Sequence, residues 1–370
     1  MAIDKRGDDS WRFRINYKGQ TYSTTFKGTE REAKKAHEAF KVDIQRGDVG
    51  ENENMRFCEL SQLVYTEYCK KHIRAGTQRI YQNVYNNHLN PYFGSKKLNQ
   101  ITPMMIQKFI NEKANTFKYN TVSGIANVLS RTFSLAVDWR IIKESPYRNI
   151  KITNNEDKVD ELLSLDDIRK LLCIYENDTN LLHKSAFYLA IACGLRNSEI
   201  RALTVNDIDF KNCTININKQ IGEGRDEEGN IVDGLIVPTK TKESTRKVYA
   251  PDMVIDCLKQ YIESLIWIPK SGQIFINATN GKPITKHCLS KRFKAVMVGN
   301  GMDPIRFHDL RHLQATLLMY AGVNLQSISQ RLGHSNTDTT LRVYTHNILD
   351  KDKETASVLE KTIDNIKRAD

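Results

Sequence analysis

Two polar segments interrupt the hydrophobic pattern of this chain and limit how it can fold. Residues 48–54 read DVGENEN and residues 151–161 read KITNNEDKVDE, and both contain few apolar side chains. A segment with little apolar surface to bury does not join a packed core, so each reads as a linker. The 370 residues are enough for two or three domains. We expect three domains, at residues 1–50, 56–150 and 160–370.

The first predicted domain combines a small sheet with one helix. Residues 10–27 alternate apolar or aromatic with polar side chains, contain four basic and no acidic residues, and break at a turn near Gly19. A helix should begin at Thr29, where Glu32 completes a capping-box pattern, and end near Gly47. Alternation lets one face of the sheet pack on this helix. The opposite face would present three basic side chains, Arg12, Arg14 and Lys18.

The second predicted domain is helical. Residues 57–142 carry apolar residues at spacings of three and four in four successive runs, which predicts four helices. Glycine and proline mark the ends of the helices, because neither continues a helix easily. The expected ends are near Gly76, near Pro91–Gly94, near Asn120 and before Ser145-Pro146.

The same domain is strongly basic. Residues 56–150 hold fourteen basic and five acidic side chains, so this segment carries +9 of the chain's net charge of +11. A charge excess in one segment attracts a polyanion, with nucleic acid as the first candidate. A well-solvated basic surface would have the same composition. Candidate DNA contacts in this domain are Lys70, Lys71, Arg74, Arg79, Lys118 and Arg131.

The last predicted domain mixes helices with short strands. Ser164, with Asp167 three residues later, caps a helix over 165–176, and an apolar helix follows over 184–193. At least five more helices are expected before residue 343. The strand-like runs are 213–221, 231–238 and 245–250. The whole chain is therefore expected to be mainly α with small β elements.

Composition excludes several classes of protein. No apolar run approaches the roughly 18 residues of a membrane span, and no charged-then-apolar leader opens the chain. The seven cysteines form no CxxC pair and no HxH pair occurs, which argues against a disulfide framework and against a zinc site. We expect a soluble cytoplasmic protein with no metal and no cofactor.

Histidine and arginine cluster near the end of the chain. Four of the nine histidines fall between residues 308 and 346, within HDLRH, RLGH and VYTH. Upstream, Gly194 can end a helix and leave Arg196 at the mouth of a turn. Each piece alone has an ordinary structural explanation. Together, two arginines, two histidines, a lysine hairpin and a tyrosine form a cationic pocket beside a phenol, which suits a phosphodiester.

These residues resemble the tyrosine recombinases, or phage-type integrases. The matching motifs occur in the family's order, and the small sheet at the start resembles the arm-site-binding domain of integrases from phages and conjugative transposons. Such a sheet would insert in the major groove of DNA. The matching segments are GLRNSEIRALTVNDID at 194–209, PTKTKESTRKVYAP at 238–251, FHDLRHLQATLL at 307–318 and RLGHSNTDTTLRVYTH at 331–346.

The resemblance implies a catalytic role for six residues. Tyr344 would attack a DNA phosphodiester to give a 3'-phosphotyrosyl bond and a free 5'-hydroxyl, so the bond energy is kept and rejoining is the reverse step. Arg196 and Arg311 would hold the phosphate oxygens. The remaining roles are general base for His308, phosphate hydrogen bond for His334, and general acid for Lys240, with Lys242 as the alternative. Glu199 would orient Arg196.

The resemblance also implies partners. They are double-stranded DNA at core and arm sites, three further copies of the chain in a tetramer on two duplexes, and an excisionase or DNA-bending accessory protein. The chain would integrate and excise a prophage or a conjugative element. A type IB topoisomerase and a catalytically silent DNA-binding regulator are the alternatives. The amphipathic tail would dock on a neighbouring protomer or in cis through Val358, Leu359, Ile363 and Ile366.

Overall fold

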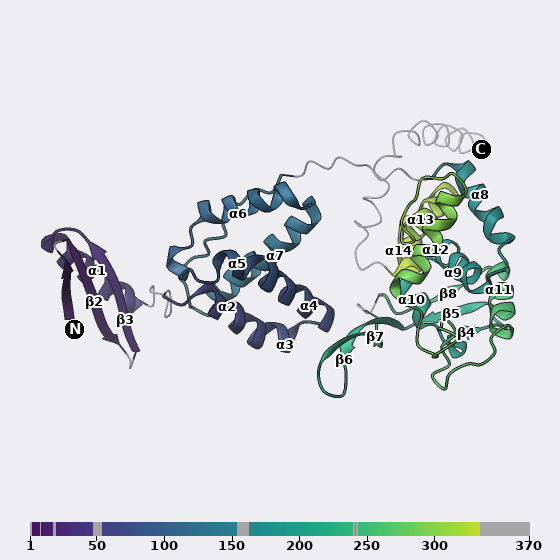
Figure 1. Ribbon diagram of the computed structural model, residues 1–370, viewed down its shortest axis with the longest axis horizontal. Helices are drawn as coiled ribbons and strands as arrows, with labels where there is room; N and C mark the ends of the chain where they lie inside the picture. The colour runs from purple at the N-terminus through teal and green to yellow at the C-terminus, as the bar shows by residue number, and fades with distance from the viewer. Residues whose placement is uncertain are drawn as a thin grey trace, which may run out of the picture. The chain divides into compact units, whose positions relative to one another are not determined.

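The structure is a computed structural model that describes residues 2–7, 9–17, 20–46, 54–153, 163–239, 241 and 243–333. Over these residues helices predominate and the strands form three small antiparallel sheets, which confirms the mainly α class (Figure 1). The chain divides into two compact units, Met1–Val159 and Asp160–Asp370, and each is described by itself. The division into three domains stays a prediction.

The first unit begins with a three-stranded sheet. Strands β1 (Ala2–Gly7), β2 (Ser10–Tyr17) and β3 (Gln20–Lys27) pair in the order β1-β2-β3. On β2, Phe13 and Ile15 are buried, whereas Arg14 is exposed. Successive side chains of a strand point to opposite faces, so Arg12 and Arg14 lie together on the face opposite Phe13.

One helix covers the apolar face of this sheet. Helix α1 (Glu30–Arg46) begins with the predicted capping box, in which the backbone N of Thr29 donates to Glu32 Oε2 at 2.9 Å. The Phe13 ring meets the imidazole of His37 edge-on, with centroids 5.3 Å apart. Because aromatic burial on this face anchors the helix, the basic face of the sheet remains available for a partner.

Four helical rods follow, as predicted, but the first two contain a π-helical turn each. A π turn adds a residue to the repeat and cannot be anticipated from a pattern of three- and four-residue spacings. The rods are α2 (Phe57–Val64), η1 (Tyr65–Cys69) and α3 (Lys70–His72); α4 (Ala75–Val84), η2 (Tyr85–Leu89) and α5 (Asn90–Phe93); α6 (Pro103–Thr116) after the short η3 (Leu98–Gln100); and α7 (Tyr119–Asp138).

Three helix ends were predicted too late. The first rod ends at His72 rather than near Gly76, which lies inside α4. The third ends at Thr116 rather than near Asn120, and the fourth ends at Asp138 rather than just before Ser145. Arg140 then has a positive φ of 57°, which breaks the helical path although Ile142 is buried. Apolar residues after the helix pack on the same core. The hydrophobic pattern in the sequence therefore continues beyond the end of the helix.

Phenylalanines fill the centre of this bundle. Phe57, Phe93 and Phe133 are fully buried, and the ring of Phe57 lies 5.6 Å from that of Phe93 and 5.7 Å from that of Phe133. The hydroxyl of Tyr85 in η2 is 2.7 Å from that of Thr132 in α7. A buried polar group needs such a partner, so this bond fixes the second rod against α7.

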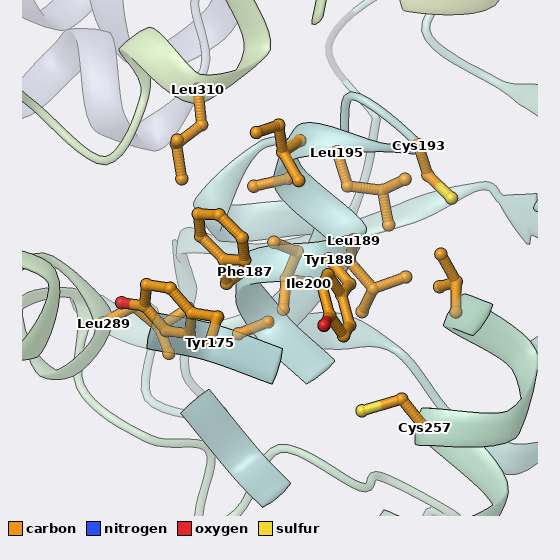
Figure 2. Packing of buried hydrophobic residues seen from close by; sticks show 14 of the residues in the cluster. Tyr175, Phe187, Tyr188, Leu189, Cys193, Leu195, Ile200, Cys257, Leu289 and Leu310 are labelled. Carbon is orange, nitrogen blue, oxygen red and sulfur yellow. The ribbon is translucent and has the colours of Figure 1, made fainter. Parts of the chain in front are cut away.

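The second unit is built around one buried helix, α9 (Leu181–Ile191), which the sequence placed at 184–193. Every residue from 185 to 191 is buried, and Figure 2 shows Phe187 and Leu189 inside the cluster that surrounds it. Phe187 stacks on Tyr175 with ring centroids 3.9 Å apart. The other helices are α8 (Leu165–Glu176), α10 (Asn197–Ala202), η4 (Val205–Asp207), α11 (Asp252–Glu263), α12 (Lys286–Gly299), α13 (Asp309–Tyr320) and α14 (Leu325–Leu332).

Short strands form two sheets in this unit. Strands β4 (Ile208–Asp209), β5 (Thr214–Ile217) and β8 (Arg246–Tyr249) make one sheet, and β6 (Lys219–Arg225) pairs with β7 (Ile231–Pro238) in a hairpin that extends from the unit (Figure 1). The run predicted as one strand at 213–221 is therefore two strands of different sheets. The connection from β7 to β8 spans the predicted lysine turn.

Over the part of the chain that the structure describes, no helix is long and apolar enough to cross a membrane.

Candidate active site

Arg196 lies in the turn between α9 and α10, as the sequence predicted. Gly194 in this turn is left-handed, with φ of +67°, and a Cβ there would lie 2.1 Å from Gln314 Oε1. The turn therefore requires glycine for both conformation and space. Arg196 is the last residue before α10, and its side chain is 28% exposed. A substrate can therefore reach this guanidinium.

The carboxylate of Glu199 holds Arg196 in place. Nη1 of Arg196 donates to Oε1 of Glu199 at 2.7 Å, and the backbone N of Arg196 donates to Oε2 at 2.9 Å. Burial raises the pKa of Glu199, but the guanidinium groups of Arg246 and Arg196 more than offset it, so the pKa lies below its ordinary value. The charged carboxylate makes the orienting contact expected of Glu199.

Arg311 connects two segments that are far apart in the sequence. It is 1% exposed, in the first turn of α13. Nη1 donates to the carbonyl oxygen of Gly194, and Nη2 donates to that of Leu332. Leu332 is the last residue of α14, and Gly194 precedes Arg196 by two residues. Arg311 therefore ties the Arg196 turn and the end of α14 to α13.

His308 lies just before the first residue of α13. The helix begins at Asp309, and the backbone N of Arg311 donates to the carbonyl of His308 at 3.1 Å. Burial of the imidazole, and the positive charges of His312, Arg311 and Arg196, lower the pKa of His308 to about 4. Part of the surface of His308 is nevertheless exposed to solvent. The ring is therefore neutral near pH 7 and accessible.

The β7–β8 connection packs against the end of α14. Gly333 ends that helix with φ of +64°, and a Cβ there would lie 2.7 Å from the carbonyl oxygen of Glu243. Within the connection, the hydroxyls of Thr239 and Thr245 are 2.7 Å apart. Only glycine allows the two segments to approach so closely. The residues that flank the predicted lysines thus lie beside the residue that precedes His334.

Three of the six predicted catalytic residues are described, and the structure brings them together. Arg196 precedes α10, whereas His308 and Arg311 lie at the start of α13. Both arginines are close enough to affect the pKa of His308. The other three, together with the alternative acid and one residue of the sheet turn, lie outside the described residues. These are Tyr344, His334, Lys240, Lys242 and Lys18.

Sequence reasoning missed Arg246, which contacts Glu199 from β8. The segment was quoted for its lysine turn, but the arginine was not given a role. Alternation along β8 was the available signal, because Arg246 shares a face with the buried Val248 and Ala250. An arginine on the inward face of a strand needs a buried partner.

Sequence reasoning also missed a role for Gln314. Its Nε2 donates to the carbonyl oxygen of Ala192 at 2.7 Å, and the residue is 3% exposed. The bond runs from α13 to the segment that follows α9. No sequence pattern predicts such a bond, because its partner is a backbone carbonyl more than a hundred residues away.

Most of the candidate DNA contacts of the helical bundle gather at one corner. Lys70 and Lys71 lie in α3, Arg74 lies immediately before α4, and Arg79 lies in α4; all four are exposed. One of them, Lys71, forms an ion pair with Glu67. The corner between α3 and α4 therefore holds four of the fourteen basic side chains of residues 56–150.

Arg131 belongs to the same corner, whereas Lys118 does not. The guanidinium of Arg131 lies over the ring of Tyr68 in η1, 4.9 Å from its centroid, although Arg131 comes from α7. Lys118 precedes the first residue of α7. At 1.5 Å per residue, the two backbones are about 20 Å apart along the helix axis.

Among the described residues, no group of three histidine, cysteine, aspartate or glutamate side chains could hold a metal ion.

Comparison with known proteins covers most of the chain. The profile of the phage integrase family matches residues 161–350, and that of the phage integrase N-terminal SAM-like domain matches residues 62–114. The ICEBs1 integrase of Bacillus subtilis (strain 168) is 27% identical over 341 residues, which cover 90% of this chain and 90% of that protein.

Two solved structures have a similar fold. The Tn1549 transposon integrase in complex with transposon right end DNA matches with a TM-score of 0.70 at 20% identity, covering 83% of this chain and 100% of that one. A lambda integrase dimer bound to a COC' core site matches with a TM-score of 0.59 at 18% identity, covering 92% and 93%. The family profile itself spans just over half of the chain and includes Arg196, His308 and Arg311. The chain therefore belongs to the phage integrase family of tyrosine recombinases.

Proposed function

We propose that this chain is a site-specific DNA recombinase that cuts and rejoins DNA through a phosphotyrosyl intermediate and so integrates and excises a mobile element. The observation that carries the proposal is the convergence of Arg196, Arg311 and neutral His308 where α10, α13 and the end of α14 meet. Two guanidinium groups beside a proton acceptor suit a phosphodiester under nucleophilic attack. Membership of the family supplies the nucleophile.

The reaction is an exchange of ester bonds. The phenol oxygen of Tyr344 attacks phosphorus, the bond to the 5'-oxygen breaks, and the 3'-phosphate stays attached to the enzyme. His308 accepts the phenolic proton, and Lys240, or Lys242 in its place, donates a proton to the departing oxygen. A phenol with a pKa of about 10 is rarely ionised at pH 7, so an adjacent neutral imidazole is needed.

The arginines stabilise the charge of the five-coordinate transition state. Both terminal nitrogens of Arg311 donate to backbone carbonyls, which fix its guanidinium beside the proposed phosphate position. Arg196 is more exposed and can meet a non-bridging oxygen directly. His334, which directly follows Gly333 in the sequence, would complete the set of donors.

The remaining parts of the chain bind DNA. We assign residues 1–50 to arm sites through Arg12, Arg14 and Lys18, and residues 56–150 to the core site through the α3–α4 corner and Lys118. The last domain, residues 160–370, carries the chemistry. Four copies on two duplexes would exchange strands, aided by an excisionase or a DNA-bending protein, in the cytoplasm where the DNA lies. Lambda integrase has been solved as a tetramer bound to a Holliday junction, which supports this assembly.

Substituting the nucleophile tests the reaction. Tyr344→Phe should bind core-site DNA with unchanged affinity and form no covalent adduct with a nicked suicide substrate, because only the attacking oxygen is lost. Denaturing gel electrophoresis of the protein with labelled DNA measures the adduct. Tyr249→Phe, a change at an exposed tyrosine of β8, should retain adduct formation. An adduct with Tyr344→Phe would contradict the assignment, and supercoil relaxation without strand exchange would favour a topoisomerase.

Substituting two sheet arginines tests the arm-binding role. Arg12→Ala with Arg14→Ala should weaken binding to duplexes from the ends of the mobile element by about tenfold to a hundredfold, since two phosphate contacts are lost. Cleavage of core sites should not change. The control is Lys35→Ala on the exposed side of α1. Equal binding by the double variant and the control, measured by fluorescence anisotropy, would reject the role.

The pKa of His308 gives a pH test. In the unfolded chain a histidine titrates near 6.5, whereas burial and neighbouring cations hold the pKa of His308 near 4 in the folded protein. As pH falls from 6.5 toward 4, the unfolded state binds a proton that the folded state does not, so the free energy of unfolding decreases. NMR of 13C-labelled histidine, assigned with His308→Gln, should give a midpoint below 5. A midpoint at or above 6.5 would show that the site does not lower the pKa of His308.

A further inference from the structure

A buried carboxylate links Arg196 to a second arginine, Arg246. The side chain of Arg246 is 6% exposed and that of Glu199 is 2% exposed. Nη1 of Arg246 donates to Oε1 of Glu199 at 3.1 Å, and Nη2 donates to Oε2 at 3.0 Å. This parallel pair fixes the plane of the carboxylate. The same two oxygens also accept from Arg196, Oε1 from its Nη1 and Oε2 from its backbone N.

Arg246 is itself held on further sides. Its Nε donates to the carbonyl oxygen of Arg331 at 2.8 Å, and Nη1 donates to that of Ser244 at 3.1 Å. Its backbone, at the first residue of β8, is in register with Ile217 of β5. The guanidinium of Arg246 therefore has little freedom to rotate, and it restrains the orientation of the Glu199 carboxylate.

These contacts join three segments of the proposed active site. Ser244 belongs to the connection that carries the candidate acid, Arg331 lies near the end of α14, two residues before Gly333, and Glu199 lies in α10 beside Arg196. Without Arg246, the buried carboxylate of Glu199 would keep Arg196 as its arginine partner. The side chain of Arg196 is partly exposed to solvent. Such a carboxylate could rotate with Arg196 rather than restrain it.

We propose that Arg246 is a positioning residue that, through Glu199, fixes the guanidinium of Arg196 where the scissile phosphate binds. The proposal rests on the proposed recombinase function. Arg246 does not touch DNA in this account, so it should act on the rate of cleavage and not on DNA affinity. A small displacement of a catalytic group lowers a rate strongly while leaving ground-state binding intact.

The test uses the full chain and a nicked duplex carrying the core site at which the unmodified chain forms an adduct. Arg246→Lys keeps the charge but loses the planar fork, because an ammonium cannot hold two carboxylate oxygens and the Arg331 carbonyl at once. The single-turnover rate of adduct formation should fall about tenfold to a hundredfold. The affinity for the same duplex should stay within about threefold, since the phosphate contacts are unchanged.

A matched control and a double variant separate positioning from general structure. Lys247→Met changes the next residue of β8, which is exposed on the other face, and should leave the rate unchanged. In an Arg196→Lys background, Arg246→Lys should cost less than about threefold, because coupled residues are not additive. A general folding defect would instead reduce the rate by the same factor in both backgrounds.

The outcomes distinguish this proposal from the proposed function. Wild-type cleavage by Arg246→Lys, or an equal loss in both backgrounds, overturns the positioning role alone. Arg246→Met removes the charge as well and should be slower than Arg246→Lys; if it does not fold, the lysine variant decides. If the unmodified chain forms no adduct with DNA that it binds, the recombinase function itself is wrong.

Discussion

The fold of the proposed active site depends on the burial of the Arg311 guanidinium. Its two terminal nitrogens donate to the carbonyl oxygens of Gly194 and Leu332, which are separated by more than a hundred residues of sequence. A buried charge is tolerated only where polar groups surround it. The requirement to satisfy Arg311 therefore brings the α9–α10 turn and the end of α14 to α13. The positions of Arg196 and of the segment leading to His334 follow from that.

Two glycines make this convergence sterically feasible. Gly194 and Gly333 both have positive φ, and at each an added Cβ would collide with a neighbouring segment. At Gly194 the neighbours are Gln314 and Leu332, and at Gly333 the nearest atom is the carbonyl oxygen of Glu243. The cationic cluster is thus assembled where the backbone of each glycine closely approaches a neighbouring segment. Such contacts are rigid, which suits a site that must hold a transition state.

Much of this organisation was predictable from local sequence. The capping boxes at Thr29 and Ser164, the four helical rods and the turn at Gly194 depend on residues within one or two turns of one another. The catalytic candidates were identifiable because their residue types and order match a family.

The contacts that position the catalytic candidates were not predictable. The π turns in the first two rods, the division of 213–221 into β5 and β6, and the pairing of Arg246 with Glu199 all depend on packing between distant segments. A hydrophobic period averages over such local shifts. A charged residue on the inward face of a strand predicts a buried partner. The sequence of the strand does not identify that partner.

The central claim is that one phenol oxygen forms the bond to DNA beside this cluster. The most direct measurement is mass spectrometry of the covalent protein–DNA adduct after digestion of both components, which identifies the residue that carries the nucleotide. The account predicts a 3'-phosphate ester on the peptide that contains Tyr344. Attachment to any other residue, or a DNA-cleaving chain that carries no nucleotide, would contradict it.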